Sequence, residues 1–76
     1  MRRRLNLTYP PQMIQEPVIY MVSKECNIVP NIRKARVTDT IGEVLLDFEG
    51  EEEDLEKGIK YLTRLGITVE EIRNET

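Results

Sequence analysis

Seven consecutive residues without a charge, 26–32, hold the side chains best suited to contact a ligand. In a chain in which 33% of the residues are charged, such a gap indicates burial or contact. Asn27 and Asn31 flank three apolar residues, and an amide offers hydrogen-bond donors and an acceptor without the cost of burying a charge. The candidate ligand-binding residues are Asn27, Ile28, Val29 and Asn31. A purely structural interpretation is also compatible, in which Asn27 ends the preceding helix while Ile28 and Ile32 fill the core.

The residue types needed for catalysis or metal binding are scarce. The chain has no histidine and only one cysteine, Cys26. A single cysteine excludes an internal disulfide, and it excludes a zinc site or an iron–sulfur cluster held by the cysteines of one chain. No base is available to activate Cys26, so we expect it to be a small core residue. The acidic run 51–54 lacks the alternating oxygen spacing of a calcium loop and suits a helix start. We therefore expect no enzyme, no catalytic residue, no cofactor and no metal, and carboxylates that are solvated with ordinary pKa values.

The length of 76 residues predicts one small domain, residues 1–76, with 73–76 as a frayed tail. A core of this size is marginal and often gains from an oligomer. The net charge is −3, but residues 1–38 have seven basic and two acidic side chains whereas 39–76 have four basic and twelve acidic ones. With few aromatic residues, the basic start 2–4 does not predict nucleic-acid binding. The sequence shows no export signal and no segment long enough to insert into a membrane. Together with the free thiol, this predicts a cytoplasmic location.

Hydrophobic periodicity places six elements along the chain. We expect strands at 2–9, 28–38, 43–49 and 67–72, and helices at 17–25 and from Glu51 to Leu65. The parity of Ile32 differs from that of Ala35, which predicts a β-bulge near Asn31. Gly42 is expected to take a positive φ in the turn before the third strand, Gly58 to let the second helix approach the sheet closely, and Gly66 to end that helix.

The order βαββαβ predicts an α+β fold of ferredoxin-like type. With two right-handed crossovers, both helices cover one face of a four-stranded antiparallel sheet of strand order 4-1-3-2. The other face is then bare and presents Arg4, Asn6, Thr8, Lys34, Arg36, Leu45, Asp47 and Glu49. A protein partner could dock on this bare face or on the edge formed by the second strand.

The chain resembles the NIL domain family in the order and spacing of several short motifs. These are Asn27-Ile28-Val29 before a strand, Ile32, Gly42, Asp47-Phe48-Glu49-Gly50, an acidic helix start, Tyr61-Leu62 and the run from Gly66 to Glu70. Val29 stands where the Asn-Ile-Leu triplet that names the family has leucine. The resemblance covers Arg3 to about Ile72 and also implies a ferredoxin-like fold.

The resemblance implies a regulatory function. NIL domains occur at the C-terminus of the ATPase of methionine-importing ABC transporters, where they dimerise, bind methionine and inhibit transport, and also fused to ferredoxins or alone. By position, Asn27 matches the asparagine of the methionine site, with Ile28 and Val29 as apolar neighbours. The expectation is a small stand-alone domain that binds methionine or a related sulfur metabolite as a homodimer. The alternative is a ligand-free interaction or dimerisation module, with a ferredoxin-type partner in sulfur metabolism as one option.

Overall fold

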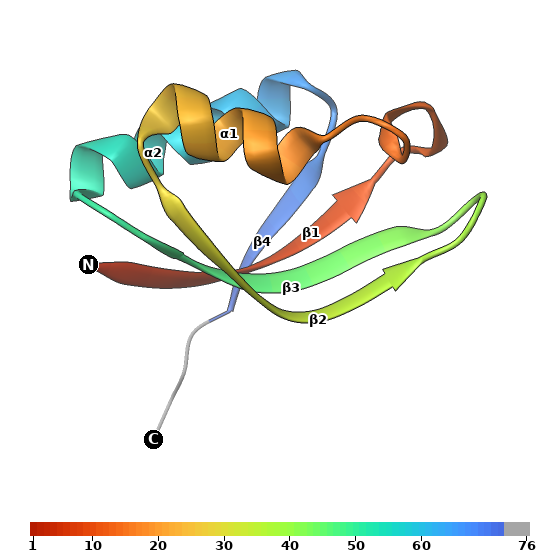
Figure 1. The fold of residues 1–76 in the computed structure, drawn as a ribbon, viewed down its shortest axis with the longest axis horizontal. Coiled ribbons are helices and arrows are strands. Elements are labelled where there is room, and N and C mark those ends of the chain that lie inside the picture. The colour runs from red at the N-terminus through yellow and green to blue at the C-terminus, as the bar shows by residue number, and fades with distance from the viewer. Residues whose placement is uncertain (73–76) are drawn as a thin grey trace.

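The structure, a computed structural model, describes residues 1–72 as four strands and two α-helices with one short 3-10 helix (Figure 1). The elements are β1 (Arg2–Tyr9), η1 (Pro11–Met13), α1 (Val18–Cys26), β2 (Val29–Val37), β3 (Gly42–Glu49), α2 (Glu52–Arg64) and β4 (Thr68–Ile72). Each predicted strand and helix is present within one or two residues of its predicted bounds. The predicted frayed tail, 73–76, lies outside the described residues.

The four strands form one antiparallel sheet in the order β2-β3-β1-β4. Both helices lie on the same side of this sheet (Figure 1). The predicted α+β ferredoxin-like fold and its strand order are therefore confirmed. β1 and β3 are central, which agrees with their regular alternation of apolar and polar residues, because a central strand with one covered face buries every second side chain.

The core lies between the helices and the covered face of the sheet. From the sheet it contains Leu5, Leu7, Val44, Leu46 and Phe48, and from α1 and α2 it contains Val18, Val22, Cys26, Leu55 and Leu62. Leu46 and Phe48 are fully buried at the centre of this cluster. The apolar stripe of α2 continues through Ile59 and Leu65, which are partly buried against the same core.

Strand β2 is an edge strand that the helices barely cover. The predicted bulge is present and falls between Ile32 and Lys34, so that Arg33 has no partner in the β3 register. The bulge places Ala35 on the same side of the sheet as Ile32, because Ile32 pairs with Leu46 and Ala35 pairs with Val44. The alternative in which Ile32 fills the core is wrong, because 53% of its surface is exposed. Val37 is 60% exposed, and the far end of the β2–β3 hairpin extends beyond both helices (Figure 1).

The glycines follow the predictions only in part. Gly66 ends the α2 region with a φ of 88°, as expected of a glycine that stops a helix. Gly42 does not have the predicted positive φ. Its site instead leaves no room for a side chain, because a Cβ there would lie 2.9 Å from the Cβ of Tyr9. Gly58 lets α2 approach α1 and Ile28 closely, whereas a close approach to the sheet was predicted. A Cβ added at Gly58 would lie 2.5 Å from Ile28 Cδ1.

Candidate functional site

The loop between α1 and β2 is held by Ser23. The main-chain oxygen of Ser23 accepts hydrogen bonds from the N–H groups of Asn27 and Ile28, and its Oγ donates to the Ile28 carbonyl at 2.7 Å. Asn27 adopts the left-handed conformation, with φ 57° and ψ 50°, which asparagine tolerates better than most residues. The prediction that Asn27 ends the helix is confirmed, and the loop presents its amide from a fixed backbone.

The four candidate ligand-binding residues separate into exposed and buried side chains. Asn27 and Asn31 are exposed, and Val29 is 63% exposed. Ile28 is only 2% exposed and packs in the core beside Gly58 of α2. The structure therefore brings three of the four to the surface near the start of β2, whereas Ile28 anchors the loop from below.

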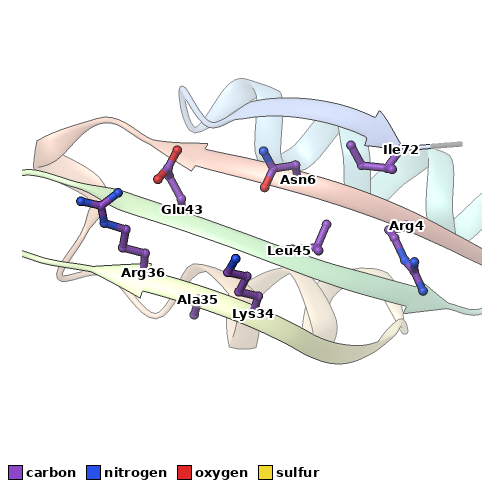
Figure 2. Close-up of a pocket in the computed structure, with 8 residues that line it drawn as sticks. All are labelled: Arg4, Asn6, Lys34, Ala35, Arg36, Glu43, Leu45 and Ile72. Carbon is purple, nitrogen blue, oxygen red and sulfur yellow. The ribbon is translucent and has the colours of Figure 1, made fainter. Parts of the chain in front are cut away.

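The sheet face without helices, here called the open face, has a shallow hollow of about 480 Å³. It is lined by Arg4, Asn6, Lys34, Ala35, Arg36, Glu43, Leu45 and Ile72 (Figure 2). Figure 2 shows Lys34 and Arg36 rising from β2 toward β3, with Leu45 at the centre of the face. Among residues 1–72, neither Lys34 nor Arg36 has an ion-pair partner within 4 Å. The β2 side of the hollow is therefore a positively charged wall.

Asp47 on the open face is buried, with 1% of its surface exposed. Arg4 Nε donates to Asp47 Oδ1 at 2.9 Å, and Arg33 Nη1 donates to Oδ2 at 3.3 Å. The hydrogen bond from Arg4 and the charges of both arginines hold the pKa of Asp47 below its usual range, although burial acts in the opposite direction. The prediction that the sheet carboxylates are solvated with ordinary pKa values is wrong at Asp47, because two guanidinium groups cover it.

Sequence reasoning placed Arg4 and Asp47 on the same face but missed their pairing. They are direct partners in the β1–β3 register, and only that register brings them into contact. Arg33 reaches the same carboxylate from the bulge in β2. The available signal was that Arg4 and Asp47, which have opposite charges, were predicted on the same face of two neighbouring strands. Arg33 gave no such signal, because its position in the bulge breaks the alternation of β2.

The basic start of the chain is built into β1 and faces carboxylates. Arg3 is the most enclosed of its arginines, with 18% of its side chain exposed, and it approaches Glu56 at 3.0 Å and Glu52 at 3.4 Å. Arg2 lies 3.7 Å from Glu49 on the neighbouring strand. These contacts neutralise the arginines and tie β1 to α2 and β3.

Cys26 is a buried residue of the core, with 7% of its surface exposed. Burial raises the pKa of its thiol, and the nearby Glu25 and Asp54 raise it further while Lys57 lowers it. The thiol is therefore protonated at neutral pH and poorly nucleophilic.

Two searches over residues 1–72 bear on metals and membranes. No group of three histidine, cysteine, aspartate or glutamate side chains in this part of the chain is arranged to hold a metal ion. No helix there is both long and apolar enough to cross a membrane.

The fold and the motif at the start of β2 define the class of protein. A model of the NIL domain family matches residues 3–71, and the chain belongs to that family. It is 31% identical over 61 residues to the methionine import ATP-binding protein MetN 1 of Listeria monocytogenes serotype 4b, and equally to that of Listeria innocua serovar 6a. Each match covers 75% of this chain, which spans only 18% of the length of these relatives.

A solved structure supports the fold independently. The C-terminal domain of an ABC transporter ATP-binding protein from Enterococcus faecalis superposes with a TM-score of 0.85, covering 96% of this chain and 86% of that one at 22% identity. At this identity the likeness shows the fold alone, and it agrees with the ferredoxin-like arrangement described above.

Proposed function

We propose that this NIL domain is a regulatory module that binds a small amino acid, methionine or a close sulfur-containing relative, by contact with Asn27, Val29 and Asn31. The observation that carries the proposal is the exposed amide of Asn27, held in a left-handed conformation by the Ser23 hydrogen bonds. The family, and the printed name of its methionine-importing relatives, support the ligand class. The module acts by binding and not by catalysis, on the cytoplasmic side of the membrane.

The surface chemistry near the start of β2 suits such a ligand. Val29 offers an exposed apolar contact for a thioether, and the amides of Asn27 and Asn31 offer donors and acceptors for the ammonium and carboxylate ends. Arg33 has 46% of its side chain exposed and bonds Asp47 through one nitrogen, which leaves further donors for a ligand carboxylate. Ile28 contributes from the core, because its packing sets the position of the loop.

A second copy would complete this site. The three exposed residues lie at the start of an edge strand, where main-chain groups are open to pairing. Ile32 and Val37 expose apolar surface on the helix side of the same strand. Pairing of β2 with β2 of a second copy would extend the sheet, cover these residues and give the ligand a second wall.

The competing function is a ligand-free interaction module, with a ferredoxin-type protein of sulfur metabolism as a candidate partner. The exposed edge of β2 favours it as well, since strand addition does not require a small ligand. The two functions differ in one measurable property, the response of the folded state to free amino acids.

The deciding experiment is thermal unfolding of the protein with each amino acid and with homocysteine. A ligand that binds only the folded state stabilises it by about 2.7 kcal/mol at a hundredfold excess over Kd, which is several degrees for a domain of this size. We expect a shift with methionine that is lost in Asn27→Gly. Glycine is preferred to alanine because it removes the amide and still accepts the left-handed conformation.

The matched control is Gln15→Ala, which removes an exposed amide from another loop and should keep the methionine response. A wild-type protein that shows no shift with any amino acid at millimolar concentration would refute the ligand proposal and leave the interaction module. Loss of the response in both variants would refute the assignment of the ligand to Asn27.

A further inference from the structure

The β-bulge in β2 brings the side chain of Arg33 back toward the start of the strand. Arg33 has no partner in the β3 register, and its Nη1 donates a hydrogen bond to Asp47 Oδ2 at 3.3 Å. Asp47 is the direct register partner of Asn31, one of the candidate ligand-binding residues. The guanidinium group of Arg33 therefore lies on the open face beside Asn31.

The cluster around Asp47 has one more positive charge than negative charges. Arg4 already bonds both oxygens of this carboxylate, through Nε at 2.9 Å and Nη2 at 3.5 Å, and the hydrogen bond from Arg4 holds the pKa of Asp47 below its usual range. The ionised carboxylate thus contributes one negative charge to two guanidinium groups. No second acidic side chain within residues 1–72 forms an ion pair with Arg33. The charge of Arg33 is therefore uncompensated.

Arg33 also has hydrogen-bond donors to spare. Its side chain is 46% exposed, and only Nη1 bonds another side chain within residues 1–72. The remaining N–H groups lie in one plane, an arrangement that matches the two oxygens of a carboxylate. Val29, which is 63% exposed, lies two residues before Asn31 on the same face, about 7 Å along the strand. An extended methionine is long enough to reach from the guanidinium group to this apolar side chain.

We propose that Arg33 binds the α-carboxylate of the amino-acid ligand, so that the site takes a free amino acid and rejects relatives whose carboxyl group is an amide or part of a peptide bond. This inference rests on the proposed function and names the ligand group that the site requires. The bound carboxylate supplies the negative charge that the cluster lacks. Asp47 is a positioning residue, because it holds the guanidinium group beside Asn31, and Val29 contacts the thioether end.

The other two cations of β2, Lys34 and Arg36, suit this role less well. Both follow the bulge whereas Asn31 precedes it, so they lie farther along the strand. Neither is held by a carboxylate within residues 1–72, so binding would have to order a long side chain that Asp47 has already ordered in Arg33. Position and preorganisation therefore both select Arg33.

The test is calorimetric titration of L-methionine and of L-methioninamide into the wild type, Arg33→Gln and Arg36→Gln. Methioninamide keeps the thioether and the ammonium group, which is protonated at about pH 6, but lacks the charged carboxylate. The wild type should bind methionine about tenfold or more tightly than methioninamide, because the amide forfeits a charge-assisted hydrogen bond. In Arg33→Gln the affinity for methionine should fall by about tenfold or more while that for methioninamide stays the same, so the preference disappears.

Arg36→Gln is the matched control, because it removes the same charge from an exposed position of the same strand and should keep the wild-type preference. Arg33→Gln should still fold, since Arg4 keeps both of its bonds to Asp47, and thermal unfolding without ligand checks this.

Three results would overturn the assignment of Arg33 and leave the amino-acid ligand in place. These are a wild type that binds both compounds equally, an Arg33→Gln variant that keeps the preference for methionine, and a variant that loses both compounds to the same extent, as a purely structural role would predict. A wild type that binds neither compound at millimolar concentration would overturn the proposed function together with this inference.

Discussion

Gly58 in α2 provides the sharpest test of how the candidate loop is anchored. In a helix interior, glycine to alanine normally stabilises by about 1 kcal/mol. Here the new Cβ would lie 2.5 Å from Ile28 Cδ1, whereas its next neighbour, Val22 Cγ2, would be 3.5 Å away. Overpacking of a buried site costs about 2 kcal/mol. Gly58→Ala should therefore destabilise the protein by about 1 kcal/mol, against the usual effect of this substitution.

Ile28→Val removes the one atom responsible for the overlap. This change alone should cost about 1 kcal/mol for the lost methyl group. In the Ile28→Val background the added Cβ at position 58 meets no close atom, so Gly58→Ala should now stabilise by about 1 kcal/mol. The sign of the same substitution reverses, and the coupling energy between the two positions is about 2 kcal/mol.

The assay is equilibrium urea unfolding of the four proteins, followed by circular dichroism. A domain of this size has a total stability of about 4 to 11 kcal/mol, so changes of 1 kcal/mol are measurable. Thr63→Ala, an exposed change on the same helix, is the control and should have the same effect in both backgrounds. If Gly58→Ala has equal effects with isoleucine and with valine at position 28, the close approach described here does not limit packing and the reasoning is refuted.

Three further predictions follow from buried side chains. Asp47→Asn should lower stability by about 2 kcal/mol at pH 7 through the weakened arginine hydrogen bonds. The pKa of Asp47 is lower in the folded than in the unfolded state, so its carboxylate contributes fully to the free energy of unfolding above about pH 4 and this contribution is lost as the pH falls further. The stability difference between the variant and the wild type should therefore shrink in acid. A constant difference in urea unfolding across pH 3 to 7 would contradict this. Leu46→Asp places a charge at a fully buried position and should abolish the folded circular dichroism spectrum at neutral pH, and a stable variant would disprove its core position. Cys26 should react with a thiol reagent only as fast as the protein opens, since burial raises its pKa and blocks access, and rapid labelling of the native protein would contradict its burial.

The fold was predictable because its determinants are local along the chain. Alternation in β1 and β3, the apolar stripe of α2 and the stop at Gly66 each depend on a few neighbouring residues. The order of elements and the handedness of the crossovers then leave one arrangement of strands. The bulge in β2 was visible for the same reason, since the parity of Ile32 and Ala35 could not be satisfied by a regular strand.

The candidate site was predictable only in part. Asn27 as the end of α1 follows from its type and its place after the helix. Ile28, Val29 and Asn31 were assigned to the same site, yet Ile28 lies in the core while the other two are exposed. Which of these side chains is covered depends on where α2 crosses, and that is set by contacts between residues far apart in the chain.

The sequence by itself determined the secondary structure and the strand order, because periodicity and turn residues act over short distances. Only the tertiary structure decided that Asp47 is buried under two arginines, that Ile32 is exposed, and that Lys34 and Arg36 line one hollow on the open face. These features depend on strand register and on the area that two short helices can cover. Both are properties of the packed molecule, since a shift of the register would change every cross-strand neighbour while leaving each strand's own pattern the same.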